Sequence, residues 1–471
     1  MVKKYIPQGH EDPIITLCRM VTESAYNDLP DDVSTFAKYS ILDTLGVMLG
    51  GTGRAGIAPV VELAKEKGGK EESHIICYGG KVPAASAAMA MGPMTRSMDF
   101  AQLHPVAYHC SEHTLPALMA ALGLQKKVSG KEFIAAFTLG QEVMIRIALS
   151  CNLEKAVSMG FGGGQYIFGS VAGVGKLIGL TQHQLEMAEG IGRQMTQPHD
   201  RSMFYPMTLM VRVHQGFVAQ DAITCCRLAM NGITGPRNEI LVGPRGFLSS
   251  FKWETSPEPL TRGLGEHWDI IDVQMKPFSG CKSTHSSVFG LLAEMEKHSF
   301  TADDILAIHI DQSSGGWQLG CEPWDEKLDP KTEYDCQFSL PYSVATAAYD
   351  KDVFVTSYTP EKISRVAVRE FMQKITAEED STLPPWSSRL HIKLKNGTEI
   401  VEEYFGEQLK GTKNNPFTEE ELADRFKKCA AFSVYELSDS VIASLIDKLL
   451  NLEKVEDVTK EIILPITPDK E

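Results

Sequence analysis

The sequence lacks the closely spaced cysteines that hold metals and iron–sulfur clusters. Its ten cysteines are scattered along 471 residues, and none form a C-x-x-C pair. A structural zinc site or an iron–sulfur cluster is therefore not expected. Thiols spread in this way are typical of a reducing compartment, where most serve as small buried apolar groups.

Long apolar runs are also missing, and no stretch approaches the ~20 apolar residues that a membrane-spanning helix needs. The first residues, "MVKKYIPQGHEDPIITLCRM", have a basic start but no apolar signal core. With 43% hydrophobic and 23% charged residues, the composition is that of an ordinary globular protein. We therefore expect a cytoplasmic protein without a membrane partner.

An excess of positive charge is a third absence. The formal net charge is −15, which argues against nucleic acid as a partner. An acidic surface still permits a small anionic substrate, provided that a local pocket is basic.

The glycine-rich stretch at 159–179, "MGFGGGQYIFGSVAGVGKLIG", matches neither G-x-G-x-x-G nor G-x-x-x-x-G-K-[ST]. Nucleotide binding is therefore not expected. Two interpretations stay open: a loop whose following helix start holds a substrate carboxylate, and glycines that let helices pack closely.

Helical patterning dominates both ends of the chain. Ser129 with Glu132 and Thr181 with Gln184 have capping-box spacing, and apolar residues follow each pair at helical intervals. In the middle, 267–278 and 303–313 have the pattern of short strands, and 391–404 that of a hairpin with Asn396-Gly397 at its tip, the turn best suited to a two-residue loop.

These patterns predict a mainly α protein of two domains. A large all-helical domain takes residues 1–265 with 405–471, and a smaller inserted α+β lid domain takes 266–404. At 471 residues the chain is too long for one simple core. A crevice between two such domains is a common place for a small-molecule site.

Titratable residues gather in "SMDFAQLHPVAYHCSEHTLPALMAALG", residues 97–123. His109 and His113 have the spacing of metal ligands on a helix, with Asp99 or His104 available to complete a site. The same residues can instead hydrogen-bond to a helix start, or they can carry acid–base chemistry. The residues alone leave all three interpretations open.

Cationic residues occur in two further segments. Lys276, Lys282 and His285 lie in a predicted strand-to-helix connection, and Arg201 and Arg212 lie ahead of or within another helix. Arginine can bind a carboxylate through two parallel hydrogen bonds. Equally, the first segment can be an ordinary capping loop and the arginines can form ordinary ion pairs.

Six segments, in this order, resemble the MmgE/PrpD family over nearly the whole chain. They are "YSILDTLGVMLGG" (39–51), "SMDF…H…LPALMAALG" (97–123), "SGKEFIAAFTLGQEVMIRI" (129–147), "GITGPRNEILVGPRGF" (232–247), "KPFSGCKSTH" (276–285) and "QFSLPYSVATA" (337–347). The resemblance implies a homodimer of helical domains with α+β lids, and an active site between the two domains. It also implies small di- or tricarboxylate substrates and neither a metal nor an organic cofactor.

The resemblance also implies roles for single residues. His109 becomes the proton-transfer residue, Asp99 the residue that orients it and keeps it basic, and His285 a second acid or base. The predicted substrate-binding residues are Lys276, Lys282, His104, Arg201, Arg212 and Gln165.

Four positions depart from the family pattern. Gln102 stands in a segment that usually reads D-F-D-D, and Glu112 in one that usually reads H-P-S-G. A histidine expected near residue 160 and a lysine expected near residue 206 are missing. These departures favour a substrate other than methylcitrate or cis-aconitate.

The predicted function is a lyase, a dehydratase or decarboxylase that moves a proton at a carbon next to a carboxylate. One alternative is an isomerase, an epimerase or racemase of a small amino- or imino-dicarboxylate that uses the same groups. The other alternative is a non-catalytic ligand-binding paralogue.

Overall fold

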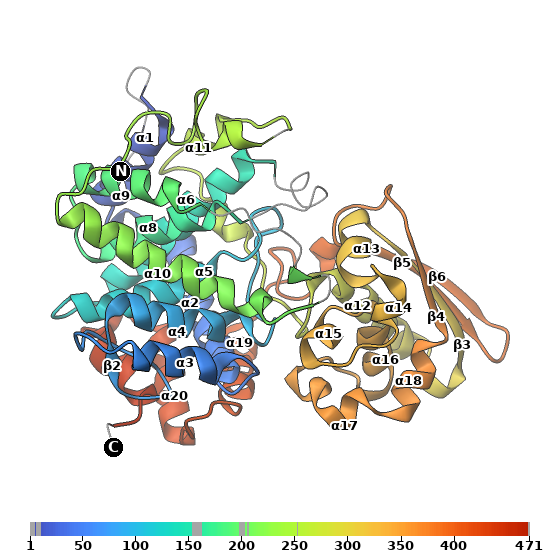
Figure 1. Ribbon diagram of the computed structural model, residues 1–471. Coiled ribbons are helices and arrows are strands. Elements are labelled where there is room, and N and C mark those ends of the chain that lie inside the picture. The colour runs from blue at the N-terminus through green and yellow to red at the C-terminus, as the bar shows by residue number, and fades with distance from the viewer. Residues whose placement is uncertain are drawn as a thin grey trace.

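The computed structural model describes residues 5, 11–152, 163–196, 203–204, 207–251 and 253–469. Within them the chain forms a larger helical body, which holds the elements near both termini, and a smaller body with a sheet at its outer edge (Figure 1). The prediction of a mainly helical protein is confirmed.

The larger body contains most of the long helices and one very short pair of strands. Its elements are α1 (Pro13–Glu23), α2 (Asp31–Gly51), α3 (Ile57–Glu66), β1 (Ser73–His74), β2 (Lys81–Val82), α4 (Ala84–Arg96), α5 (Ser111–Ala121), α6 (Gly130–Ser150), α8 (Tyr166–Leu177), α9 (Gln182–Gln194), α10 (Met210–Met230), α11 (Glu258–Thr261), α19 (Glu419–Ala430) and α20 (Asp439–Leu450). The predicted capping boxes are confirmed at Ser129 with Glu132 and at Thr181 with Gln184. The prediction of purely helical structure here misses the pair β1–β2, which is antiparallel.

The smaller body packs short helices against one face of a four-stranded sheet. Its elements are α12 (His285–Lys297), β3 (Ile305–Gln312), α13 (Ser314–Gly320), α14 (Trp324–Lys327), α15 (Glu333–Gln337), α16 (Leu340–Asp350), α17 (Pro360–Ile363), α18 (Val366–Met372), β4 (Ile375–Glu379), β5 (Ser388–Leu394) and β6 (Glu399–Tyr404). The strand order is β4-β3-β5-β6, with β3 and β4 parallel and the other pairs antiparallel.

Two sequence predictions in this region need correction. Residues 395–398 connect β5 to β6, so the hairpin exists but its connection is longer than two residues. The strand predicted at 267–278 is wrong, since Asp269–Asp272 forms a 3₁₀ helix and only isolated β-bridges flank it, His267 to Leu264 and Gln274 to Leu103. The valine and isoleucines of that segment pack into the helical core, which explains why the segment has an apolar pattern without forming a strand.

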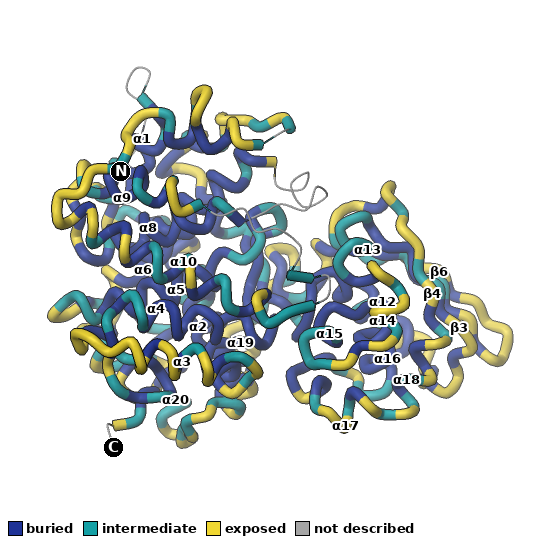
Figure 2. The backbone as a smooth tube through the Cα atoms, viewed as in Figure 1, coloured by how far each residue is buried: buried dark blue, intermediate teal, exposed yellow. Residues whose placement is uncertain are grey.

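Two separate hydrophobic cores underlie the two bodies. The first takes buried residues between Tyr5 and Met275 and again between Leu422 and Ile466, and the second takes them between Val288 and Ile400. Buried backbone alternates with exposed turns in both bodies (Figure 2). The boundaries of the predicted domains, at 265/266 and 404/405, stay a prediction.

Glycines of the 159–179 stretch bring helices into close contact. A Cβ atom on Gly169 of α8 would lie 2.5 Å from the carbonyl oxygen of Gly140 in α6. A Cβ atom on Gly140 would lie 2.7 Å from the carbonyl oxygen of Gly169. The packing interpretation of these glycines therefore holds for α8, while 159–162 lie outside the described residues.

Helix α6 is long and apolar enough to cross a membrane, which the search for apolar runs in the sequence missed. Within the protein, however, 94% of its most apolar window is buried. A helix that other helices surround in this way is typical of a protein core.

Gly130, the first residue of α6, offers a test of this packing. A Cβ atom there would lie 1.6 Å from the carbonyl oxygen of Leu452, whereas one on Gly315 in α13 would meet nothing within 4 Å. We predict that Gly130→Ala lowers the free energy of unfolding by about 1–3 kcal/mol, although alanine favours helix. Gly315→Ala should change it by no more than about 1 kcal/mol. Urea unfolding followed by circular dichroism measures both, and equal midpoints would contradict the packing.

Candidate active site

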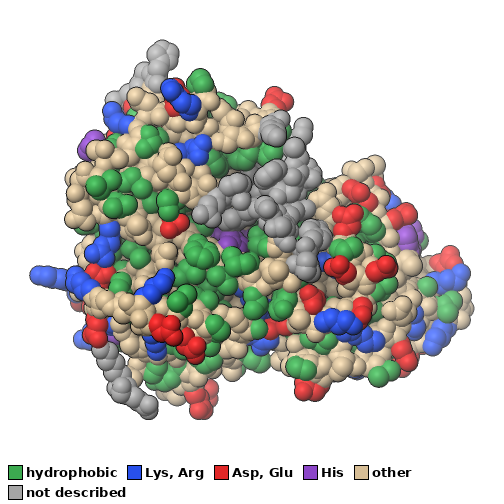
Figure 3. All heavy atoms as spheres, viewed as in Figure 1, with side chains coloured by type: hydrophobic (Ala, Val, Ile, Leu, Met, Phe, Trp, Pro, Cys, Tyr) green, Lys and Arg blue, Asp and Glu red, His purple; other side chains and the backbone are tan. Residues whose placement is uncertain are grey.

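A cavity of about 130 Å³ lies where the smaller body meets the larger one. In Figure 3, histidine atoms are visible near the middle of the molecule. The described residues that line the cavity come from both bodies: Arg96, Asp99, Leu103, Tyr108, His109, Gly163, Tyr166, Met203, Phe204, Val211, His214, Lys276, Cys281, Lys282, Leu319, Phe338 and Trp386.

Three charged side chains form the buried floor of the cavity. Arg96, the last residue of α4, forms an ion pair with Asp99 Oδ1. Lys276 Nζ donates to the same oxygen at 2.5 Å, to the Asp99 carbonyl at 3.2 Å and to the Gly280 carbonyl at 3.1 Å. All three side chains are at least 95% buried. Because its three N–H groups already have acceptors, Lys276 braces the site more than it offers itself to a substrate.

Asp99 sits in an unusual backbone conformation, with φ at +47°. Its carbonyl oxygen accepts a hydrogen bond from Gly280 N at 2.9 Å, which ties it to the segment ahead of α12. Burial favours the neutral acid, but Arg96 and Lys276 outweigh it and hold the pKa of Asp99 well below its usual range. The aspartate is therefore charged at neutral pH.

The carboxylate that faces His109 is Glu112, whereas the resemblance implied Asp99. His109 Nδ1 lies 3.3 Å from Glu112 Oε1, an ion-pair distance. Gln215 Nε2 donates to the other oxygen, Glu112 Oε2, at 3.3 Å, and Arg96 Nε lies 3.7 Å from it. Glu112 belongs to the first turn of α5, so the departure from the family pattern at residue 112 puts an acid into the site.

His109 is the more accessible member of this pair, with 23% of its side chain exposed, whereas Glu112 is fully buried. Burial and the nearby Arg96 lower the pKa of His109, and Glu112 opposes that shift. Burial alone would raise the pKa of Glu112, but His109 and Arg96 lower it. A neutral imidazole beside a charged carboxylate is the usual arrangement of a general base.

Lys282 also lines the cavity, and Gln274 Oε1 accepts a hydrogen bond from its Nζ at 2.8 Å. Burial, together with the like charge of Lys276, lowers the pKa of Lys282 to about 7. Its ammonium group therefore gains or loses its proton near physiological pH.

Other predicted residues lie behind the cavity. His285 begins α12 with its side chain buried, 5.7 Å from the Phe278 ring, and burial lowers its pKa well below the usual value. His104 Nδ1 accepts hydrogen bonds from Val106 N at 3.1 Å and Ala107 N at 3.0 Å, which stabilises a turn. The described residues that line the cavity do not include these two histidines.

Arg212 and Gln165 are buried beside the site as well. Arg212 donates to the Ala55 carbonyl and to Gln337 Oε1, both at 3.1 Å, and pairs with Glu333 at 3.2 Å. It therefore joins α10 to the smaller body. Gln165 Nε2 donates to a backbone carbonyl, that of Ala107, at 3.5 Å. Arg201 lies outside the described residues.

His113 packs as part of the helix start. Its ring stacks on Tyr166 with centroids 3.9 Å apart, and its Nδ1 lies 2.6 Å from the His109 carbonyl oxygen. The ring of His214 follows at 5.6 Å. This geometry supports the helix-start interpretation for His113, and α5 begins at Ser111, before Pro116.

Three residues that line the cavity, Arg96, Tyr108 and Trp386, were not predicted from the sequence. Tyr108 meets Trp386 edge to face at 6.1 Å, so residues far apart in the chain enclose one side of the cavity. Single aromatic residues carry no spacing signal that predicts such a contact. For Arg96, one weak signal in the sequence indicated a place in the site. It lies three residues before Asp99, at the end of an apolar helix.

Comparisons with known proteins identify the family. The MmgE/PrpD N-terminal domain matches residues 15–259 and the MmgE/PrpD C-terminal domain matches residues 278–450. The chain belongs to the MmgE/PrpD family. Cis-aconitate decarboxylase of Mus musculus is 26% identical over 94% of this chain and 92% of its own length. The human protein of the same name is 27% identical over 91% of this chain and 89% of its own length. The Aspergillus terreus protein of that name is 24% identical over 96% of this chain and 96% of its own length.

The buried charge cluster predicts a large stability effect. We expect Asp99→Asn to lower the free energy of unfolding by about 3–5 kcal/mol, because Arg96 and Lys276 would stay buried without their carboxylate. The matched control is Asp352→Asn, which breaks the half-exposed pair with Lys428 and should cost at most about 1 kcal/mol. Urea unfolding measures both, and a similar small loss in the two variants would contradict this account.

Proposed function

We propose that this member of the MmgE/PrpD family is a lyase that acts on a small carboxylate in the cavity between the two bodies. The observation that carries the proposal is the pair His109–Glu112, which stands beside the cations Arg96 and Lys282 around one small cavity. One water molecule needs about 10–15 Å³ of cavity volume, so the cavity has room for about ten waters, or about ten non-hydrogen atoms of a ligand. That is the size of a small di- or tricarboxylate.

His109 performs the proton transfer in this proposal. Glu112 faces Nδ1, so the exchangeable proton moves at Nε2. The carbon next to a carboxylate is weakly acidic, and charge that develops there spreads onto the carboxylate oxygens. Lys282 and Arg96 lower the energy of that charge because they are cations at the same cavity.

Two lyase reactions use these groups. In a decarboxylation, a C–C bond breaks, carbon dioxide leaves, and the protonated form of His109 gives its Nε2 proton to the carbon that keeps the electron pair. In a dehydration, His109 takes the proton from that carbon, the C–O bond to the neighbouring carbon breaks, and the leaving hydroxide accepts that proton from His109 to form water. The names of the curated relatives favour the decarboxylation.

The proposed substrate follows from the departures from the family pattern. The positions where the family histidine near 160 and lysine near 206 would lie fall outside the described residues. We therefore keep the prediction that the substrate differs from cis-aconitate and methylcitrate. The homodimer and the cytoplasmic location also stay predictions.

Proton exchange tests the proposed function. The purified protein is incubated in D2O with a pool of small hydroxy-, amino-, imino- and unsaturated di- and tricarboxylates, and proton NMR follows each compound. We expect deuterium in one compound together with a decarboxylated or dehydrated product. His109→Gln should slow this at least about 100-fold, and exposed His183→Gln should leave it unchanged. Exchange with inversion and no elimination would instead indicate an epimerase, and no turnover would indicate a non-catalytic paralogue.

The pKa of Lys282 predicts a pH dependence. Below pH 7 its ammonium group attracts the substrate carboxylate, and above pH 7 the amine is neutral. We therefore expect kcat/KM to fall about tenfold per pH unit above 7, since this ratio reports groups of the free enzyme. Lys282→Arg keeps its charge and should remove this basic limb. A limb that persists unchanged in the arginine variant would contradict the role of Lys282.

A further inference from the structure

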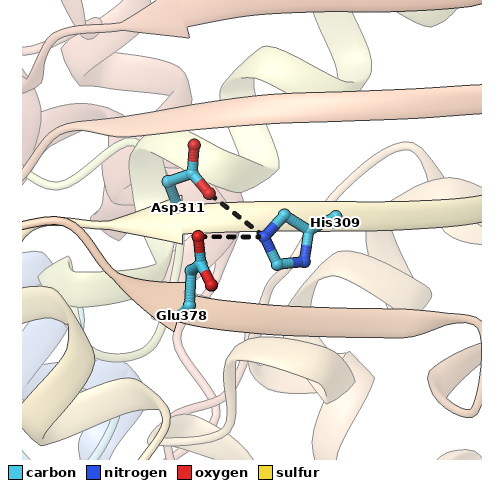
Figure 4. Close-up of side chains that lie close together, drawn as sticks. All are labelled: His309, Asp311 and Glu378. Atoms are coloured by element: carbon cyan, nitrogen blue, oxygen red, sulfur yellow. Dashed lines mark ion pairs between the residues drawn. The ribbon is translucent and has the colours of Figure 1, made fainter.

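We propose that the outer face of the small sheet binds a divalent transition metal, Zn²⁺, through His309, Asp311 and Glu378. Figure 4 shows these side chains gathered over two neighbouring strands, with the imidazole facing both carboxylates. One ligand atom from each residue lies within 4.8 Å of the others. This site is separate from the cavity that contains His109 and does not depend on the proposed function.

Strand register places the three ligands on one face. His309 and Asp311 are two residues apart in β3, so their side chains point the same way. Glu378 in β4 is the register partner of Asp311 across the parallel pair. Between and beside them, Ile308 and Ile310 point to the opposite face and into the second core. The rigid sheet therefore sets the spacing of the ligands.

The distances fit a zinc ion. His309 Nε2 lies 3.1 Å from Asp311 Oδ1 and 3.7 Å from Glu378 Oε1. Ligand atoms bound at 2.0–2.2 Å in a tetrahedron are about 3.3–3.6 Å apart. Small side-chain rotations would bring three ligand atoms to one ion, with water as the fourth ligand.

Further side chains orient these ligands from behind. His309 Nδ1 lies 2.9 Å from Thr376 Oγ1, which leaves Nε2 directed at the carboxylates. His391 Nε2 and Arg389 both contact the second oxygen of Asp311, Oδ2, at 3.0 Å, so Oδ1 stays on the side of His309. Metal-binding histidines and carboxylates usually have such supporting hydrogen bonds.

The local charge also suits a cation. Arg389 is shared among Asp311, Asp380 and Glu403, which lie 2.7–3.1 Å from it. With Glu378 there are four carboxylates to one guanidinium, which leaves a net charge of −3 when both histidines are neutral. Because thiols are the strongest competitors for zinc, it also matters that all ten cysteines are buried.

No metal is predicted from the sequence, because residue spacing along the chain does not reveal this site. Its ligands come from two strands that are about seventy residues apart in the chain. A bound ion would join β3 to β4, which is one of the two edge strands of the sheet. Metal binding would therefore stabilise the smaller body.

Isothermal titration of the full chain with Zn²⁺ tests the proposal. We expect the wild type to bind one ion that His309→Gln and Glu378→Gln each weaken at least tenfold. The matched control is His298→Gln, because His298 is also half-exposed and lies 3.1 Å from Glu294 Oε2 in α12. Its isotherm should equal that of the wild type.

Two results would overturn the zinc site. The first is that Glu378→Gln and a folded His309→Gln both bind zinc with the affinity and stoichiometry of the wild type. This result would show that other groups bind the zinc. The other is the lack of any binding heat up to millimolar Zn²⁺. Circular dichroism establishes whether the variants fold. If His309→Gln does not fold, the zinc affinity of Glu378→Gln alone tests the proposal.

Discussion

The ion pairs of Asp99 with Arg96 and Lys276 position the rest of the candidate active site. They join the end of α4 to the segment that enters the smaller body, and Gly280 N reinforces this link through the Asp99 carbonyl. A buried aspartate between two cations is stable only while all three remain. The cavity therefore has a charged floor whose disruption would cost the protein much of its stability.

This arrangement explains why the site contains a second buried acid. Asp99 is committed to two cations, so its carboxylate does not serve the imidazole as the resemblance implied. Glu112 does so from the next helix, and it also lies near Arg96. Two carboxylates then balance Arg96 and Lys276, and the charge of Lys282 is left for the anionic substrate that we propose. An anionic partner beside this buried ammonium group would favour its charged form and raise its pKa.

Local sequence signals predicted much of the fold. The capping boxes of α6 and α9 and the strand at Ile305–Gln312 are where the sequence placed them, because each depends on neighbouring residues. The strand expected at 267–278 failed because apolar residues that pack into a helical core resemble a buried strand. In the site, His109 and Lys282 were predicted and line the cavity, whereas Arg96 and Trp386 depend on contacts between distant segments.

In the proposed site, Glu112 sets the basicity of His109. NMR titration of the His109 imidazole, in the wild type and in Glu112→Gln, tests it most directly. Because the charge of Glu112 raises the pKa of His109 against burial and Arg96, the account predicts a lower His109 pKa in the variant. An unchanged pKa in a folded Glu112→Gln protein would show that Glu112 does not act on His109 and would contradict the account.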